Sequence, residues 1–495
     1  MSHPRRWWIL GVLCLSLLVL VVDNTVLNLA IPALMRDLGA TPSDIQWIID
    51  SYVLVFAGLL LTAGSLSDRY GRRRLLIVGL VFFGGASVVA MLAAEPWQLI
   101  GARALMGVGG SLIMPSTLSI LITVFDESER RKAIAAWSSV AMVGVIAGPT
   151  LGGFLLEHFY WGSVFLLNVP IAVLAVIAAI VLMPETRGSV RKLDPVGVVL
   201  SIVGMAALVW VVITMPTDGL DPLSVAVAVL ALGGFVLWER RAEHPMLPLR
   251  LFRDRSFSGA CFSIVLLSFG SGALMLALTQ YLQFVLGYGP MRAGLALLPY
   301  VVAALMFNGL GAGLGKKVSN RTLIVVGLFV LAAGFGVLST LGGGYTVLIT
   351  SLIIMGVGGG LAGPAAYATL MGAVPAEHAG VGSALNDTVQ QVGMALSVAV
   401  LGSVLAGAYT ATMPETAPEA ARDSISGALA LGDPSLAATA KDAFVSAMSV
   451  GSFVGVGCSL AAALVALLVL RRTSAAGAPA AEAPVAGAPT AGTPA

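Results

Sequence analysis

Three ionisable side chains stand inside long apolar segments of the sequence, where a charge is costly unless it is paired or hydrated. They are Asp23, Asp50 and Arg103. At a rise of about 1.5 Å per residue, Asp23 lies roughly 12 Å from the outer end of its predicted helix, and the other two lie about 8 to 9 Å from theirs. Because separate exposure to lipid would be very costly, we expect the three side chains to share one polar cavity.

A carboxyl group in such a cavity can exchange a proton. Burial favours its neutral form and a nearby arginine favours its charged form, so its proton affinity changes as the cavity opens to either side. Export of a cation could then be coupled to inward proton flow, through competition for one negative charge. The alternative is a permanent Asp–Arg pair that only holds helices together.

The elements that carry these residues are predicted from composition. The chain has 495 residues, of which 58% are apolar and 11% charged, whereas a soluble protein is about 25% charged. Apolar runs long enough to cross a bilayer recur from end to end, which predicts an all-α membrane protein. Breaking the chain at its polar clusters predicts fourteen helices, at about 7–31, 45–66, 74–94, 97–120, 133–156, 162–183, 196–215, 222–238, 257–283, 291–314, 321–341, 345–369, 381–407 and 443–470.

The positive charges support this count. If the N-terminus is cytoplasmic, 22 of the 27 Lys and Arg residues fall in inner segments, four fall in outer segments, and Arg103 lies within a span. A missed helix would invert the later loops and destroy this bias. The Arg-rich, Lys-poor composition points to a bacterial genome. We therefore expect a multi-pass protein of the bacterial inner (cytoplasmic) membrane, with both termini in the cytoplasm.

Sites of other chemistry are not visible. The three cysteines lie in separate apolar runs without CxxC spacing and the four histidines are scattered, so we expect no metal site. The sequence has no GxxxxGK[ST], GxSxG or HExxH motif. We therefore expect no cofactor, no nucleic-acid partner and no enzymatic activity. A membrane enzyme or a receptor would need a catalytic cluster or a sizeable soluble domain.

An internal repeat predicts the domain organisation. GVGGSLIMP at 107–115 recurs as GVGGGLAGP at 356–364, and GSLSDRYGRRRLL at 64–76 matches AGLGKKVSNRTLI at 312–324 more weakly. Two six-helix bundles with two inserted helices explain both, and such repeats place a binding site between the halves, near the membrane midplane. The predicted units are an N-terminal bundle (1–190), the inserted helices with a linker (191–255), a C-terminal bundle (256–472) and a disordered Ala/Pro/Gly-rich tail (473–495).

Several motifs, in order and at characteristic spacing, resemble those of the major facilitator superfamily, and specifically its fourteen-span drug:proton antiporters of the EmrB/QacA type. The motifs are VDNTVLNLAIP (22–32), WIIDSYVLVFAG (47–58), GSLSDRYGRRR (64–74), LIGARALMGVGGS (99–111), GVIAGPTLGGFL (144–155), FLLNVPI (165–171) and YLQFVLGYGPMRAGLALLP (281–299). The resemblance implies that a monomer uses protons to export hydrophobic and cationic drugs through the bilayer.

The glycine-rich antiporter motif has four residues of interest. Glycines let helices approach closely and proline interrupts the backbone ladder. The resemblance implies a packed hinge that limits leakage and permits rocking, and the alternative is simple tight packing. The residues are Gly148, Pro149, Gly152 and Gly153.

The loop motif at 64–74 contains Gly64, Gly71, Asp68 and Arg72. Asp68 and Arg72 are four positions apart and can pair on one helical face. The resemblance implies that Asp68 attaches to the positive N-terminal end of the thirteenth helix, near Gly380, and so holds the outward-facing state. The alternative is that the loop acts only as an orientation signal.

For the substrate, the resemblance implies that Asp387, with Asn386 and Gln391, lines the cytoplasmic opening; a helix-start charge favourable to the dipole is the alternative. Aromatic faces attract organic cations, although interface anchoring is the commoner role of aromatic residues near helix ends. Further predicted cavity residues are Trp47, Tyr52, Trp137, Gln280 and Tyr281.

Two functions share these motifs. One is multidrug efflux that confers antibiotic or antiseptic resistance, and the other is dedicated export of one endogenous metabolite or antibiotic. An importing symporter fits the antiporter motif less well.

Overall fold

A computed structural model describes residues 4–188, 194–219, 221–242, 245, 247, 249–314, 318–341, 344–375 and 378–470. These residues form helices and connecting loops, and no β-strand occurs among them. The all-α prediction is therefore confirmed. The predicted disordered tail at 473–495 lies outside the described residues.

The helices follow one another along the chain with short connections. The first group is α1 (Arg6–Asp37), α2 (Pro42–Tyr70), α3 (Arg72–Met91), α4 (Pro96–Val124), α5 (Glu127–His158), α6 (Ser163–Leu166) and α7 (Asn168–Leu182). Then come α8 (Pro195–Asp218), α9 (Pro222–Glu239) and the 3₁₀ helix η1 (Leu249–Arg253). The last group is α10 (Arg255–Gln280), the π-helical turn η2 (Tyr281–Val285), α11 (Pro290–Ala296), α12 (Leu298–Leu314), α13 (Asn320–Leu338), α14 (Tyr345–Gly372), α15 (Ala379–Thr412), α16 (Glu419–Asp423), α17 (Ile425–Ala430) and α18 (Pro434–Val469).

Several helices begin at a polar residue that caps the first turn. Thr41 forms a capping box with Asp44 at the start of α2. The carboxylates of Asp221, Asp254 and Asp433 accept backbone N–H groups at the starts of α9, α10 and α18. Such caps satisfy N–H groups that have no partner within the helix. The polar clusters that separate the apolar runs thus define where these helices start.

The number of membrane crossings is compatible with the predicted fourteen. Among the described residues, nine helices are long and apolar enough to span a bilayer, and four shorter apolar segments lie in α8, α10, α12 and α15. Helix α5 has 32 residues, which is long enough to span a bilayer, but it is less apolar than these helices. Large aliphatic and aromatic side chains are exposed on the outside of the helices, for example Leu230, Phe453 and Leu468. Such an exterior suits a lipid environment.

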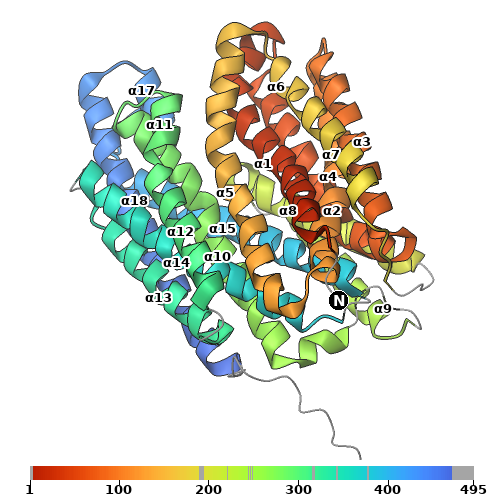
Figure 1. The fold of residues 1–495 in the computed structure, drawn as a ribbon. Helices are drawn as coiled ribbons and strands as arrows, with labels where there is room; N and C mark the ends of the chain where they lie inside the picture. Colours follow the sequence, from red (N-terminus) through yellow and green to blue (C-terminus); the bar gives the residue numbers. More distant parts are fainter. Residues whose placement is uncertain are drawn as a thin grey trace, which may run out of the picture.

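The first and the last of these groups of helices form two side-by-side bundles (Figure 1). In the first, α4 packs on α2 and α3, and α1 packs on α5. In the second, α14 packs on α12 and α13, and α10 and α18 pack on α15. Helix α8 contacts α9, α2 and α15, so it touches both bundles. The residue boundaries predicted for these units stay predictions.

The repeated glycine motif forms the same helix crossing in both bundles. A Cβ atom added at Gly109 of α4 would lie 2.8 Å from the backbone oxygen of Gly79 in α3. At the matching position of the repeat, a Cβ atom added at Gly358 of α14 would lie 2.6 Å from the backbone oxygen of Gly327 in α13. Only glycine permits so close an approach of two helix backbones.

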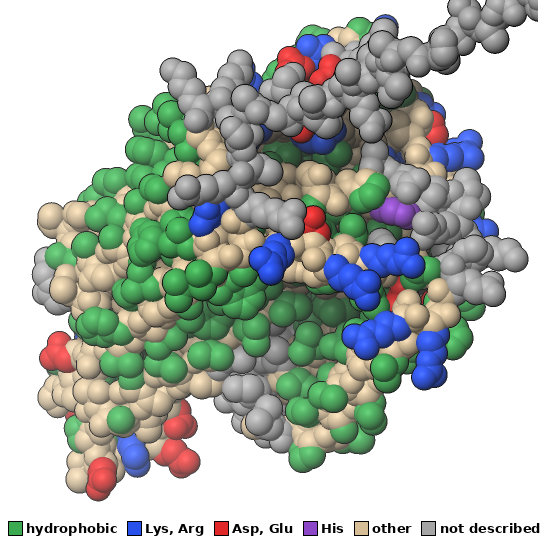
Figure 2. Space-filling model, turned by 90° about the horizontal axis from the view of Figure 1, so that it is seen from below, with side chains coloured by type: hydrophobic (Ala, Val, Ile, Leu, Met, Phe, Trp, Pro, Cys, Tyr) green, Lys and Arg blue, Asp and Glu red, His purple; other side chains and the backbone are tan. Residues whose placement is uncertain are grey.

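The bundles contact each other along two seams. One joins α2 to α15, and the other joins α5 to α12. Figure 2 shows Lys and Arg side chains gathered on the face seen from below, the end of the molecule where the N-terminus lies in Figure 1. We call this the basic end. Its existence agrees with the predicted charge bias, while its assignment to the cytoplasm stays a prediction.

Candidate functional site

The centre of the first bundle holds a buried ion pair. The Nη1 atom of Arg103, on α4, lies 2.5 Å from the Oδ2 atom of Asp23, on α1. The exposed fractions are 0% for Arg103 and 3% for Asp23. Two of the three predicted side chains are therefore brought together inside the bundle, in a region closed to solvent in this conformation.

Arg103 is held by further contacts from α2. Its Nε atom donates to the backbone oxygen of Ile48 at 3.2 Å. Its guanidinium carbon lies 4.4 Å from the ring centroid of Tyr52, a cation–π geometry. The Nη2 atom of Arg103 is buried and has no hydrogen-bond partner among the described residues. Arg103 thus connects α1, α2 and α4 and retains unused donor capacity.

Asn168 completes the ion-pair site, although no role was predicted for it from the sequence. Its Nδ2 atom donates to Asp23 Oδ1 at 2.7 Å and to the hydroxyl of Ser87 on α3 at 3.2 Å. Asn168 is the first residue of α7, directly after the short helix α6. The only sequence signal was its position in the FLLNVPI block. The carboxylate of Asp23 therefore has one partner on each oxygen, which suits its charged form.

Asp50 lies on a different face of α2. It is two positions from both Ile48 and Tyr52, which is about 200° around an α-helix from each of them. Helical periodicity instead places Asp50 on the side of α2 that carries Asp68, the side that meets α15. Of the three ionisable residues expected to share one polar cavity, Asp23 and Arg103 therefore form a buried ion pair, and Asp50 lies apart from them.

Asp387 stands on α15 in the second bundle and is 2% exposed. Its Oδ1 atom accepts a hydrogen bond from the side chain of Asn386 at 3.0 Å, and its Oδ2 atom has no partner among the described residues. The hydroxyl of the nearby Tyr367 donates to Gln390 at 3.1 Å. No ion pair with a cationic side chain is found for Asp387 in the described parts of the chain. It is a buried carboxylate with an available oxygen.

The face of α15 that carries Asp387 becomes accessible with distance from the basic end. Ala384 and Asp387 are buried, whereas Met394, two turns further along the same face, is 39% exposed. On α2, Leu61 is buried and Trp47 is 41% exposed. Along these two helices, the residues near the basic end are therefore buried and those near the opposite end are more exposed.

Asp68 closes the basic end of the seam between α2 and α15. Its carboxylate accepts the backbone N–H groups of Gly380 at 2.9 Å and Val381 at 3.1 Å, in the first turn of α15. Arg72 donates to the same carboxylate from Nη2 at 2.7 Å. A Cβ atom added at Gly64 would lie 2.5 Å from the Cβ atom of Ala384. The predicted Asp68–Arg72 pair and the predicted contact with Gly380 are both present.

Gly71 connects α2 to α3 with a backbone φ of 115°, a value that favours glycine. Its neighbour is the carboxylate of Glu185, whose Oε1 atom would lie 2.6 Å from a Cβ atom at this position. The glycine therefore provides both the sharp turn and the space that Glu185 occupies.

The antiporter motif packs α5 on α1 at one of its glycines. A Cβ atom added at Gly148 would lie 1.8 Å from the Thr25 hydroxyl oxygen. Gly152 is buried. A Cβ atom at Gly153 would have nothing within 4 Å. The side-chain environment of Pro149 lies outside the described features.

The remaining predicted substrate residues do not form one cluster. Trp47 packs against Trp210 of α8 with ring centroids 5.2 Å apart. Trp137 is buried in α5 and Tyr281 is buried in η2. The half-buried residues are Gln280, at the end of α10, and Gln391, one turn beyond Asp387.

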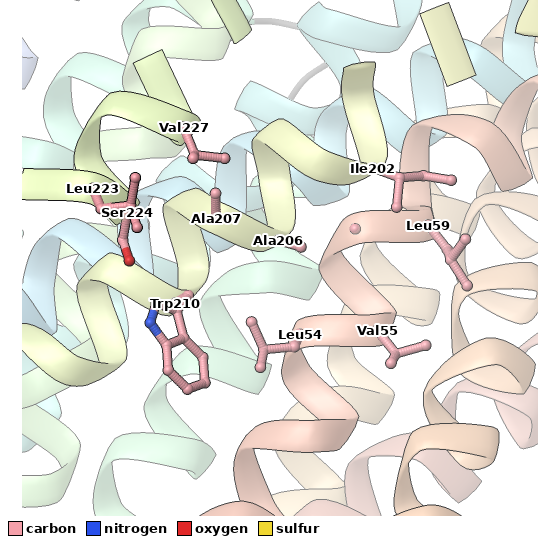
Figure 3. A pocket seen from close by; sticks show the side chains of 11 residues that line it. Leu54, Val55, Leu59, Ile202, Ala206, Ala207, Trp210, Leu223, Ser224 and Val227 are labelled. Carbon is pink, nitrogen blue, oxygen red and sulfur yellow. The ribbon is translucent and has the colours of Figure 1, made fainter. Parts of the chain in front are cut away.

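A separate apolar pocket of about 590 Å³ lies between α2, α8 and α9. Figure 3 shows its lining, with Leu54 on α2, Trp210 on α8 and Leu223 and Ser224 on α9. None of the predicted site residues lines it.

Two bundles that meet along two seams, each with a carboxylate buried in its interior, define a multi-pass membrane transporter. A family model described as Major Facilitator Superfamily matches residues 13–398. The chain belongs to this superfamily.

The similarities extend over nearly the whole chain. The multidrug efflux pump LfrA of Mycolicibacterium smegmatis is 37% identical over 489 residues, which are 96% of this chain and 96% of that protein. The puromycin resistance protein pur8 of Streptomyces alboniger is 36% identical over 433 residues, covering 85% and 86% of the two chains. The crystal structure of the human organic anion transporter MFSD10 has a TM-score of 0.65 at 13% identity, covering 94% of this chain and 100% of that one; that likeness concerns the fold.

Proposed function

We propose that this protein is a proton-coupled antiporter that exports hydrophobic and cationic compounds from a bacterial cell as a monomer. The extended similarity to the multidrug efflux pump LfrA supports export of drugs. The basic end would face the cytoplasm, as the positive-inside rule requires, and both termini would lie there.

The observation that carries the proposal is the buried pair of Asp23 and Arg103. An ion pair inside a membrane protein holds its helices together only while both groups are charged. When Asp23 binds a proton, its attraction to Arg103 is lost, and the contacts between α1 and α4 weaken. A proton from the accessible end can thereby change the packing of the first bundle, and its release restores the pair.

Asp387 supplies the second half of the proposal. A buried carboxylate with an unused oxygen, beside the aromatic ring of Tyr367, offers charge and aromatic surface to a lipophilic cation. Because Asp23 and Asp387 stand in different bundles, one can take the proton while the other contacts the substrate. Asp50, on the α15-facing side of α2, lies at the interface that the two carboxylates flank.

Export of a single antibiotic or metabolite is the second candidate. The similarity to the puromycin resistance protein pur8 favours it. The two candidates differ in substrate range, so a panel of chemically unrelated compounds separates them.

The proposal is tested in inside-out membrane vesicles that contain the protein, by measuring the uptake of a fluorescent lipophilic cation. We expect uptake to require an imposed proton gradient and to be abolished in Asp23→Asn. Asp37→Asn is the matched control, because Asp37 ends the same helix but is exposed and pairs with the adjacent Arg36. Gradient-driven uptake that survives in Asp23→Asn would remove the coupling role of Asp23, and no uptake by the unmodified protein would contradict the function.

A further inference from the structure

Asn308 of α12 reaches across the second seam between the bundles. Its Nδ2 atom lies 3.0 Å from the backbone oxygen of Ala135, 3.0 Å from the hydroxyl of Ser138 and 2.9 Å from the hydroxyl of Ser139, all on α5. Asn308 is fully buried, with an exposed fraction of 0%. An amide nitrogen has two hydrogens, so these three acceptors share two donors.

The acceptors are themselves connected. The Ser138 and Ser139 hydroxyls donate to the same backbone oxygen of Ala135, at 3.1 and 2.7 Å. The Oδ1 atom of Asn308 is buried and has no hydrogen-bond partner among the described residues, so the contact is made by its Nδ2 atom. Hydrogen bonds that share donors and acceptors in this way reinforce one another. Asn308 is therefore bound to a fixed point on α5.

The internal repeat relates this contact to the one made by Asp68. Residues 64–76 match residues 312–324, so α12 corresponds to α2, and Asn308 lies one turn before Ala312, the counterpart of Gly64. The partner helices correspond as well, because α15 meets α2 and α5 meets α12. The counterpart of Asp68 in the sequence is Lys316. An ammonium group has no acceptor, so the second half of the repeat cannot form the carboxylate contact of the first.

We infer that Asn308 is the positioning residue that closes the α5–α12 seam, as the counterpart of Asp68 at the α2–α15 seam. This inference deepens the proposed transport function and rests on it for its role in the transport cycle. The two seams are closed by different chemistry: Asp68 uses a charged carboxylate against a helix N-terminus, and Asn308 uses a neutral amide against a carbonyl and two hydroxyls. Opening the basic end requires both contacts to break.

The closure is measured by pulsed electron spin resonance on the full chain in lipid nanodiscs. Spin labels are placed on the exposed residues Glu127 of α5 and Leu314 of α12, after each is changed to cysteine and Cys14, Cys261 and Cys458 are changed to alanine. A second labelled protein carries the pair Tyr70 and Pro375 at the α2–α15 seam. The two distance distributions report the two seams separately, without any substrate.

We expect Asn308→Leu, which keeps the branching of the side chain at Cγ, to raise the population with separated α5 and α12 labels by about tenfold, as the loss of two neutral hydrogen bonds predicts. The double variant Ser138→Ala/Ser139→Ala should change the same distribution. Combining it with Asn308→Leu should add little, because all three residues act in one contact. Ser351→Ala is the matched control: it removes a hydrogen bond from α14 to Gly334 of α13, within one bundle.

Two results would overturn the inference. One is an unchanged α5–α12 distribution in both Asn308→Leu and the double serine variant, and the other is an equal change in Ser351→Ala. A failed transport assay leaves this measurement unaffected, because the distances are measured without substrate and without a proton gradient. If these variants widen the α5–α12 seam in a protein that exports nothing, the inference about Asn308 therefore stands and the proposed antiport function is contradicted.

Discussion

The Oδ1 atom of Asp68 lies 2.9 Å from the backbone nitrogen of Gly380, although the two residues are 312 positions apart in sequence. This contact joins the last turn of α2 in the first bundle to the first turn of α15 in the second. A carboxylate at a helix N-terminus interacts with both free N–H groups and the positive end of the helix dipole.

Asp68→Asn should lower gradient-driven export at least about tenfold, because hydrogen bonds to a charged group each contribute about 1.5–3 kcal/mol. Transport in vesicles containing equal amounts of folded protein is the measurement. The control is Asp221→Asn, since Asp221 also accepts two backbone N–H groups at a helix start but within a single hairpin, where asparagine caps equally well. Normal export by Asp68→Asn would contradict a role for the carboxylate in closing the seam.

Arg103→Lys should reduce export by about tenfold or more while leaving the protein folded. A lysine keeps the charge but lacks the planar fork that contacts Asp23, the Ile48 oxygen and the Tyr52 ring together. The measurement is the initial rate of gradient-driven cation uptake, with Arg36→Lys as the control on an exposed pair. If Arg103→Lys transported at the normal rate, charge alone would suffice at this position.

Gly148→Ala should lower the melting temperature of the purified protein, because the added Cβ atom would overlap the Thr25 hydroxyl oxygen at 1.8 Å. Overpacking of this kind costs about 1–3 kcal/mol. Gly153→Ala in the same motif is the control, since nothing lies within 4 Å of its added Cβ atom. The double variant Gly148→Ala/Thr25→Ala should recover part of the loss, and equal melting temperatures for the two single variants would refute the packing argument.

Asp387→Asn should weaken export of cationic compounds by about tenfold and leave neutral hydrophobic compounds within about twofold, because only the cations gain from the buried negative charge. Competition between a charged and an uncharged substrate in the same vesicles measures the selectivity. Asp423→Asn, in the short helix α16, is the control. An equal loss for both substrates would assign Asp387 to folding or coupling instead.

The stability provided by the ion pair of Arg6 and Glu129 should depend on pH. Arg6 donates to Glu129 at 2.5 Å, and this hydrogen bond lowers the pKa of the Glu129 carboxyl, which lies in the first turn of α5, before the predicted span at 133–156. Since the folded-state pKa is below the unfolded value of about 4.3, the contribution is complete above that value and is lost as pH falls through the folded-state pKa.

The melting temperatures of the unmodified protein and of Glu129→Gln should therefore differ at pH 7 and converge below about pH 4. Glu127→Gln, two residues earlier on α5, should match the unmodified protein at both pH values, because no ion pair with Glu127 is found among the described residues. A difference that persisted at low pH would show that the side chain contributes through packing and not through its charge.

Much of the fold was accessible from the sequence, because the apolar runs and the polar clusters between them define the helices directly. The association of Asp23 with Arg103 followed from the cost of isolated charges in a membrane. The position of Asp50 did not follow, because depth along a helix says nothing about which face meets which neighbour. Asn168 was missed for a related reason: it stands among apolar residues, and only the turn between α6 and α7 directs it toward Asp23.

The contact of Asn308 with α5 could not be predicted from the sequence either. Its neighbours in sequence carry no polar pattern, and its acceptors on α5 lie about 170 residues away. The repeat makes α12 the counterpart of α2, but Lys316 stands at the position of Asp68, so a copy of the Asp68 contact cannot form.

The paired crossings at Gly79 with Gly109 and at Gly327 with Gly358 bear on how the molecule deforms. Where two helix backbones are in direct contact, no side chains between them can repack. Each of these helix pairs should therefore resist sliding and bending. Any deformation must then occur elsewhere in the molecule, and the two bundles should move as rigid bodies while their individual helices keep their packing.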